Sequence, residues 1–267
     1  MVQELALAPL FDVSGRRIPS PGIGAPVNPA SPRYGLAQPA IDHSVIHRRI
    51  SEHIPGAAAV LSLDAFRDRA GALLDRLQSD PATREIARGV HVPFFLPADR
   101  SADPGQALES VYLPAVGASY TARYPKYDFR SELKGGLAGK MNVAPGSRYE
   151  VLLTALAAGP IVGVYFPLAL SGFSIDAALR QMADLPDGFV LSGGCDAAAA
   201  LVASPELIMK EDGYPPQLDL AALEGTAPRY AYHFAPYGYN LTFNGRYHNG
   251  LASDYCSSGL TWISQKF

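Results

Sequence analysis

The chain has 267 residues, of which 22 are Lys or Arg and 25 are Asp or Glu, so its net charge is −3. Hydrophobic residues make up 48% and charged residues 18%, which is enough apolar material for a core and too little charge for a disordered chain. The slight acidity and the lack of a Lys/Arg block exclude electrostatic binding of nucleic acid. Apolar runs fall short of the roughly 18–20 residues of a membrane helix, and the N-terminus does not resemble a signal peptide. We therefore expect a soluble, cytoplasmic protein with no nucleic-acid or membrane partner.

Residues 1–40 are predicted to form an extended arm. Proline fixes φ and lacks a backbone donor, so a regular helix or a central strand is excluded by Pro9, Pro19, Pro21, Pro26, Pro29, Pro32 and Pro39. Apolar residues such as Leu5, Leu7, Leu10 and Phe11 also recur here, which is unusual for a disordered tail. We expect the arm to pack on the body of the protein or on a neighbouring subunit, and residues 41–267 to form a single globular domain.

The next part of the chain alternates predicted helices with short strands. Apolar spacing and capping residues predict helices over residues 42–53, 63–79, 147–158, 175–184 and 196–203, and a helix from Pro104 that Pro114 kinks. The helix predicted over residues 147–158 begins with a capping box, which has Ser147 at the N-cap and Glu150 three residues later. Strands are predicted over residues 92–96, 161–166 and 189–192.

The C-terminal third changes to alternating apolar and polar residues, which is typical of strands. Strands are predicted over residues 229–234, 239–243 and 259–264, and Asn244-Gly245 is a strong signal for a hairpin turn. The sequence therefore predicts an α+β (mixed α/β) fold: helices and strands in the N-terminal two-thirds, followed by an antiparallel meander.

A strand, two glycines and a helix follow one another around Cys195. The glycines allow a ligand to approach the backbone, and the helix N-terminus offers free N–H groups, so Ser192, Gly193, Gly194 and Asp196 are candidate ligand-binding residues. A helix N-terminus also stabilises a thiolate, so Cys195 is a candidate nucleophile. Its base would be His233 or His248, which Asp254 could orient. This hypothesis predicts an accessible Cys195 thiol with a lowered pKa; the alternative is a tight turn with an inert buried cysteine.

The same segment, Ser192-Gly193-Gly194-Cys195-Asp196, resembles the phosphate loop of the ATP pyrophosphatases, the family of asparagine and GMP synthetases. Their pattern is Ser-Gly-Gly-x-Asp-Ser after a strand, and Ala197 stands here in place of the final Ser. The resemblance covers about a dozen residues and implies nucleotide binding at this loop.

Aromatic residues crowd the last 40 residues of the chain. Tyrosine has a flat apolar face and a polar tip, which suit sugar, nucleobase or aromatic ligands, so Tyr232 and Tyr239 are candidate ligand-binding residues. Alternation places Tyr230, Tyr232 and Phe234 on one face of a strand and His233 on the other. The alternative is ordinary sheet packing. A glycine-rich loop with Lys134 and Lys140 could contact an anion or close a pocket, or could simply be solvated.

Asp42, His43 and His47 have a spacing that would place two histidines on one helical face. A zinc helix of the familiar type has Glu directly after its first His, where this chain has Ser44, so we predict surface histidines and no metal site. The sequence identifies no cofactor. The two cysteines, Cys195 and Cys256, are too few for a disulfide framework.

Three hypotheses for the function remain open. The first is a small-molecule-binding protein or enzyme, with a pocket near the Gly193-Gly194-Cys195 turn and the tyrosine-rich C-terminal sheet. The second is a non-catalytic assembly protein that forms homo-oligomers through residues 1–40. The third is nucleotide binding at Ser192–Asp196.

Overall fold

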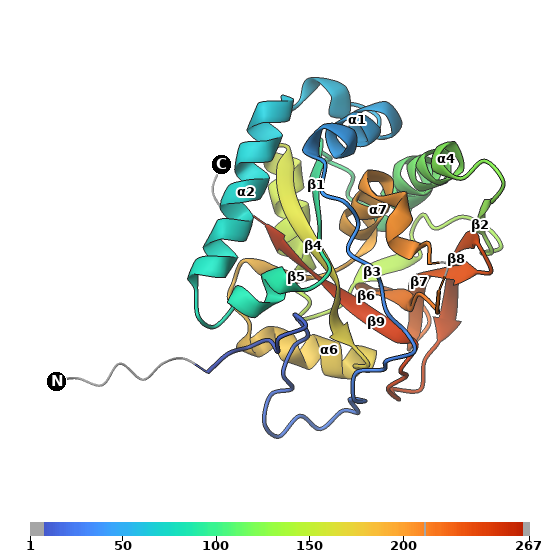
Figure 1. Ribbon diagram of the computed structural model, residues 1–267. Helices are drawn as coiled ribbons and strands as arrows, with labels where there is room; N and C mark the ends of the chain where they lie inside the picture. The colour runs from blue at the N-terminus through green and yellow to red at the C-terminus, as the bar shows by residue number, and fades with distance from the viewer. Residues whose placement is uncertain (1–7, 211, 264–267) are drawn as a thin grey trace.

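A mixed sheet of nine strands organises the described part of the chain (Figure 1). The computed structural model describes residues 8–210 and 212–263, so the first seven residues of the predicted arm, with Leu5 and Leu7, and the predicted strand end at Ser264 lie outside the described residues. The strands are β1 (Val92–Leu96), β2 (Phe129–Ser131), β3 (Met141–Val143), β4 (Ile161–Ser171), β5 (Phe189–Leu191), β6 (Gln217–Gly225), β7 (Tyr230–Tyr237), β8 (Asn240–Tyr247) and β9 (Cys256–Ile263).

The sheet has the strand order β1-β4-β9-β6-β7-β8-β2, with β3 paired to β6 and β5 paired to β9. β7 and β8, which the C-terminal alternation predicts, pair antiparallel, and β6, for which no strand is predicted, adds to β7 to complete a three-stranded meander. β9 then returns parallel to β6, and β2 lies parallel to β8, so the sheet is mixed. Strands concentrate in the C-terminal part of the chain and helices make up 35%, which confirms the predicted α+β class.

The helices lie on both sides of the sheet. They are α1 (His43–His53), α2 (Leu63–Ser79), α3 (Pro104–Ala107), α4 (Leu113–Arg123), α5 (Tyr149–Ala158), α6 (Ile175–Gln181) and α7 (Gly194–Ala203). Shorter turns of helix are η1 (Ala57–Ala59), η2 (Arg84–Arg88), η3 (Leu108–Tyr112), η4 (Met182–Asp184) and η5 (Pro205–Ile208). α7 packs between the sheet and the outer helices α1 and α4, whereas α6 lies on the opposite side, near the N-terminal segment (Figure 1). All ten residues of α7 are buried, and its alanines permit this close packing.

Local signals place α1 and α2 accurately. The carboxylate of Asp42 accepts hydrogen bonds from the backbone of Ser44 and Val45, and the hydroxyl of Ser62 accepts one from Ala65. Each side chain thus satisfies donors that a helix start leaves free.

Across the described ranges, no helix is long and apolar enough to cross a membrane.

The hairpin prediction at Asn244-Gly245 is wrong. These two residues lie inside β8, where they pair with His233 and Tyr232, and the turn comes at Gly238, between the paired residues Tyr237 and Asn240. Gly238 has φ of 61°, which supplies the left-handed conformation that a tight hairpin needs. Gly245 serves packing instead, because a Cβ there would lie 2.5 Å from the ring of Tyr230.

In the N-terminal two-thirds, one expectation is refined and one is corrected. The helix predicted from Pro104 is divided into α3, a π-helical turn, η3, and α4, and Pro114 lies in the first turn of α4. The predicted capping box at Ser147 is absent from the start of α5, because Arg148 is the N-cap residue and has φ of 61°. The Ser147 hydroxyl accepts a hydrogen bond from the backbone N–H of Tyr149.

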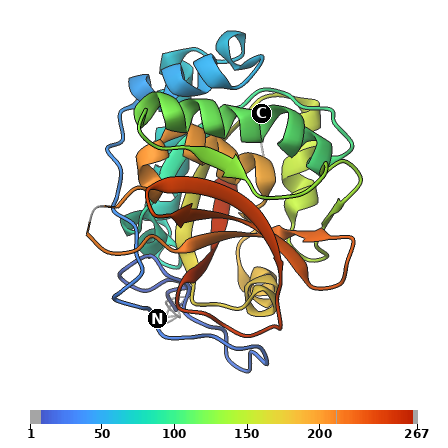
Figure 2. The ribbon, with the colours of Figure 1, turned by 90° about the vertical axis from the view of Figure 1, so that its right-hand side faces the viewer.

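Residues 8–40 follow the body of the protein without forming a helix or strand of their own (Figure 2). Backbone bonds connect them to the body from Leu10 N to Ala82 O (2.8 Å), from Arg17 N to Ala169 O (2.7 Å) and from Asn28 N to Gly172 O (2.8 Å). The described part of the predicted arm therefore packs against its own chain.

Candidate functional site

The turn between β5 and α7 is built around the carboxylate of Asp196, which is fully buried. Its Oδ1 accepts hydrogen bonds from Gly193 N at 3.0 Å and from the Tyr149 hydroxyl at 3.1 Å. Its Oδ2 accepts hydrogen bonds from Ser192 Oγ at 2.7 Å and from Thr261 Oγ1 at 2.6 Å. A buried carboxylate needs this number of donors to remain stable inside a protein. Asp196 therefore joins the turn to α5 and β9.

Other side chains of the protein fill the space beside the two glycines of the turn, so the backbone there is not open to a ligand. A Cβ on Gly193 would lie 2.4 Å from the ring of Tyr149, and one on Gly194 would lie 3.2 Å from Leu108. The Tyr149 hydroxyl also accepts a hydrogen bond from Cys195 N at 3.1 Å. A phosphate bound in the manner of the ATP pyrophosphatases would need backbone donors of this turn, and those of Gly193 and Cys195 already have partners within the chain.

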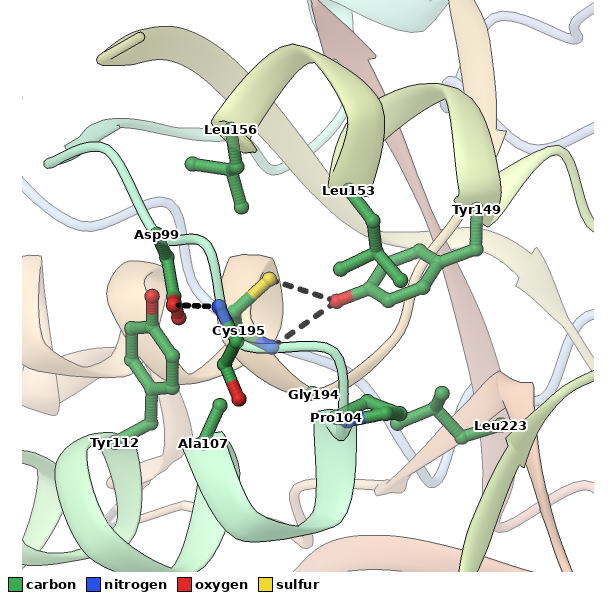
Figure 3. A pocket seen from close by; sticks show the side chains of 11 residues that line it. Asp99, Pro104, Ala107, Tyr112, Tyr149, Leu153, Leu156, Gly194, Cys195 and Leu223 are labelled. Atoms are coloured by element: carbon green, nitrogen blue, oxygen red, sulfur yellow. Dashed lines mark hydrogen bonds between the residues drawn. The ribbon is translucent and has the colours of Figure 1, made fainter. Parts of the chain in front are cut away.

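The thiol of Cys195 lines a small enclosed pocket (Figure 3). Its Sγ lies 2.8 Å from the Tyr149 hydroxyl, and Asp99 and Tyr112 approach from the other side. The pocket volume is about 20 Å³, close to the smallest space that holds one water molecule. This site is nearly closed, and its walls are both polar and apolar.

The expectation of an accessible Cys195 with a lowered pKa is contradicted. The residue is only 7% exposed. Burial, and secondly the charge of Asp196, raise the pKa of the Cys195 thiol far above its usual range, and burial also raises the pKa of Tyr112 and Tyr149. The thiol is therefore protonated at neutral pH despite its place at a helix N-terminus.

The two candidate bases lie away from this pocket, whose described lining contains no histidine. His233 is on β7, buried on the face of the sheet where Arg246 lies, and its pKa is lowered to about 4 by burial and by Arg246. Burial also lowers the pKa of His248, whose charged neighbours are Asp176, Arg229 and Arg246. Asp254 is exposed and approaches Ser31 of the N-terminal segment.

A second, larger pocket lies where the tyrosine-rich strands meet the glycine-rich loop. It has a volume of about 230 Å³ and is lined by Tyr230, Tyr232 and Tyr247 of the strands and by Lys134 and Lys140 of the loop. The Tyr230 ring makes edge-on contacts with Tyr232 (5.4 Å between centroids) and Tyr247 (5.1 Å). The alternation that places Tyr230 and Tyr232 on one face of β7 is confirmed.

The loop is held against this pocket by hydrogen bonds to its backbone. Leu137 N donates to Glu109 Oε2 at 2.8 Å, and Gly139 N donates to Asp103 Oδ2 at 2.6 Å. The Tyr232 hydroxyl donates to the carbonyl of Lys140 at 3.0 Å. Three contacts therefore hold the loop that carries the two lysines at the wall of this pocket.

Tyr239 does not belong to this pocket. It lies in the turn at the other end of the β7–β8 hairpin, where it lines a separate pocket of about 340 Å³ with Lys210 and Tyr214. Its ring stacks on Tyr127, with 5.2 Å between centroids, and its carbonyl accepts a hydrogen bond from Tyr120. The structure thus separates the two tyrosines that the sequence groups together.

The histidines of α1 pack against aromatic rings. His47 stacks on Phe95 with 5.2 Å between centroids, and its Nε2 hydrogen-bonds the carbonyl of Leu61 at 2.7 Å. His43 contacts Phe66 edge-on. Over the part of the chain that the structure describes, no three His, Cys, Asp or Glu side chains gather to hold a metal ion.

Sequence reasoning missed Tyr149, Thr261 and Asp99, the residues that surround Cys195 and Asp196. Tyr149 is 46 residues from Cys195 and Thr261 is 65 residues from Asp196, so no local pattern connects them. The chain has no significant match among protein-family models, curated proteins or solved structures, so its candidate sites are interpreted from their own geometry.

Proposed function

We propose that the protein binds a small anionic ligand in the pocket between the tyrosines of β7 and β8 and the two lysines of the glycine-rich loop. The observation that carries this proposal is the meeting, in one pocket, of Lys134 and Lys140 with the rings of Tyr230, Tyr232 and Tyr247. The proposed pocket keeps one wall of the pocket expected from the sequence, the tyrosine-rich sheet. Its other wall is the loop with Lys134 and Lys140, in place of the Gly193-Gly194-Cys195 turn.

The charge of the pocket supports an anion. Within the described residues, no carboxylate lies within the 4.0 Å ion-pairing distance of either lysine. A Cβ on Gly135 would lie 3.3 Å from Nζ of Lys140, so this ammonium group lies beside bare backbone at the pocket wall. Two ammonium groups without carboxylate partners attract an anion such as a phosphate or a carboxylate.

The tyrosines support a flat group beside the anion. Tyr232 is buried and its hydroxyl is engaged by the loop, whereas Tyr247 is 70% exposed and offers its ring to the pocket. A tyrosine ring that is fixed by neighbouring rings loses little conformational freedom when a ligand packs on it. We therefore expect a ligand with an aromatic or sugar ring next to its anionic group.

The test uses phenyl phosphate as the probe, with inorganic phosphate for comparison, and measures affinity by calorimetry at low salt. We expect phenyl phosphate to bind more tightly than phosphate. The double variant Lys134→Ala/Lys140→Ala should lose at least about tenfold in affinity, because a charge pair near a surface contributes on the order of 1 kcal/mol or more. The single variant Lys126→Ala is the charge control, since Lys126 is exposed and lies outside the pocket.

A second pair of variants tests the ring. Tyr247→Ala should weaken phenyl phosphate more than inorganic phosphate, whereas Tyr237→Ala should weaken neither. Both tyrosines are exposed, at 70% and 77%, so neither change should unfold the protein. Failure of phenyl phosphate to bind at millimolar concentration, or equal binding by the wild type and the lysine variant, would refute the proposal.

A further inference from the structure

A larger groove adjoins the lysine–tyrosine pocket. It has a volume of about 740 Å³ and runs between α4 and the segment from β2 to the glycine-rich loop. Apolar side chains dominate its walls: Leu113, Pro114, Ala118, Phe129, Leu133 and Leu137. Gly117 belongs to the same wall and brings Phe129 close, because a Cβ there would lie 2.9 Å from the Phe129 ring.

The groove and the pocket share four lining residues, which are Leu133, Gly135, Gly136 and Leu137. They therefore adjoin along this segment. Two of the four are glycines, so part of the boundary between the two spaces is backbone without side chains. The Glu109 carboxylate lies beside Gly136, where a Cβ would be 3.0 Å from its Oε2, so a ligand bound at the lysines can extend into the groove past Gly135.

Size favours a ligand that uses both spaces. Ligand pockets commonly measure about 300–1,000 Å³, and the lysine–tyrosine pocket alone measures about 230 Å³. Only the head of a ligand of ordinary size fits there. The adjoining groove, at about 740 Å³, falls within that range.

Charge gives the ligand a direction. The groove is lined by one carboxylate, that of Glu109, which accepts a hydrogen bond from Leu137 N at 2.8 Å and thus faces this end of the loop. A negative ligand group is repelled there and attracted by Lys134 and Lys140. The apolar part of the same ligand is then left to cover the leucines and Phe129 of the groove.

We propose that the ligand is amphipathic: its anionic head lies at the lysines and tyrosines, and an apolar chain extends from it into the groove beside α4. This inference rests on the proposed function, since it extends the ligand bound at the same lysines. It assigns the ligand to the class of anionic molecules with an aliphatic chain, in place of small polar anions.

The test keeps the head fixed and lengthens the chain, with phenyl phosphate, 4-butylphenyl phosphate and 4-octylphenyl phosphate below their aggregation limits. A fully buried methylene group would strengthen binding about fourfold, so the half-open groove should give at least about tenfold from phenyl to 4-butylphenyl phosphate. Affinities are measured by calorimetry on the full chain.

The variant Ala118→Phe places a ring in the groove and should abolish the gain from the chain while leaving the affinity for phenyl phosphate unchanged. Ala122→Phe is its control, because Ala122 is also exposed on α4 but does not line the groove. Melting temperatures of both variants establish that they fold.

The outcomes separate the two proposals. Binding of phenyl phosphate without any gain from the alkyl chain overturns the amphipathic ligand and leaves the anion pocket standing. A chain-length gain that Ala118→Phe does not reduce also overturns it, because the chain then lies elsewhere. If none of the three probes binds, the proposed function fails first.

Discussion

At the scale of single residues, the buried polar groups around α7 depend on one another. Tyr149 is the common partner, since its hydroxyl contacts Cys195 Sγ, Cys195 N and Asp196 Oδ1. Tyr149 is itself 1% exposed. A buried donor or acceptor that loses its partner destabilises the folded state more than a hydrogen bond stabilises it, because water cannot replace the partner.

The variant Tyr149→Phe tests this dependence. We expect it to lower the free energy of unfolding by about 1–3 kcal/mol, since it leaves Cys195 N and one oxygen of Asp196 each short of a partner. Urea denaturation measures the change. Tyr237→Phe, at an exposed tyrosine, is the control and should have no effect. Equal stability of Tyr149→Phe and the wild type would mean that water enters the 20 Å³ pocket and replaces the hydroxyl.

Cys195 should react slowly with alkylating reagents. Only the thiolate is nucleophilic, and burial raises the pKa of the thiol of this 7%-exposed residue far above neutral pH. We expect iodoacetamide to label Cys195 in the native protein far more slowly than a free thiol between pH 7 and pH 8.5, and to label it readily in urea. Peptide mass spectrometry measures both rates. Native labelling faster than that of free cysteine would restore the nucleophile hypothesis.

On the other face of the sheet, Asp219 and His233 are cross-strand neighbours whose pKa values are displaced in opposite directions. Burial raises the pKa of Asp219 to about 6, against a partial offset from Arg246, whose Nη2 lies 3.7 Å from its carboxylate. Burial and Arg246 lower the pKa of His233 to about 4. Arg246 also donates to Cys256 Sγ at 2.9 Å, so all four side chains belong to one cluster.

These displacements predict opposite effects of pH on stability. The contribution of Asp219 is present below its ordinary pKa of 3.8 and is lost as pH rises through about 6. The contribution of His233 is present above its ordinary pKa of 6.5 and is lost as pH falls through about 4. Each corresponds to about 3 kcal/mol, so between pH 4 and pH 6 the two changes largely cancel.

Single variants should expose each effect. In Asp219→Asn the free energy of unfolding should rise with pH from 4 to 6.5 relative to the wild type, because only His233 remains. In His233→Gln it should fall over the same range, because only Asp219 remains. Urea denaturation at half-unit pH intervals measures both profiles. Parallel profiles for the wild type and both variants would show that neither pKa is displaced.

At the scale of the elements, Gly245 shows how a local signal can mislead. Asn-Gly favours a tight turn because both residues tolerate positive φ, but β8 continues through this pair. A glycine stands at position 245 because the ring of Tyr230 occupies the space where a side chain there would lie. The glycine is therefore required by a contact between strands.

The variant Gly245→Ala should destabilise the protein by about 1–3 kcal/mol, because the new methyl group overlaps the Tyr230 ring at 2.5 Å. In a Tyr230→Ala background the same change should cost much less, so the double-mutant cycle should be strongly non-additive. Urea denaturation of the four proteins gives the coupling energy. Additive effects would place the strain in the backbone of β8 rather than in the contact with Tyr230.

Elements with strong local signals were the predictable ones. α1 and α2 match their predicted ranges because a capping side chain and a regular apolar stripe coincide at each. β2 and β3 have three residues each, lie in a polar, glycine-rich stretch, and exist through pairing with β8 and β6. No periodicity can appear over three residues, so such strands are invisible to pattern analysis.

In the candidate sites, too, the features with a local sequence signal could be predicted and those that depend on distant contacts could not. Alternation along β7 was enough to place Tyr230 and Tyr232 on one face. The place of Lys134 and Lys140 in the same pocket as those rings depends on Glu109 and Asp103, which bind the backbone of the loop from distant positions in the sequence. Likewise, the sequence offers a strand, two glycines and a helix start at Cys195, but the Tyr149 side chain that fills the turn comes from α5. Tertiary contacts, rather than local patterns, decide both sites.

At the scale of the whole molecule, the N-terminal segment acts as part of the core. Phe11 is 1% exposed, and its ring lies 5.7 Å from that of Phe189, a buried residue at the start of β5. The Arg16 side chain donates hydrogen bonds to the carbonyls of Ser171 and Asn28. The segment thus buries apolar surface and satisfies backbone groups at the end of β4, within its own chain.

This arrangement predicts a large, concentration-independent effect of Phe11→Ala. The change should lower the free energy of unfolding by about 3–5 kcal/mol, as expected when a buried Phe is truncated and a cavity remains. Val13→Ala, two residues away at a 79%-exposed side chain, should change it by less than about 0.5 kcal/mol. Both are measured by urea denaturation over a hundredfold range of protein concentration, with light scattering to give the molecular mass.

If the segment docks on a neighbouring subunit instead, Phe11→Ala should lower the mass of an oligomer and make the unfolding midpoint depend on concentration, because the partner then contributes to stability by mass action. A constant monomeric mass with a concentration-independent loss of stability would end the hypothesis that residues 1–40 assemble homo-oligomers.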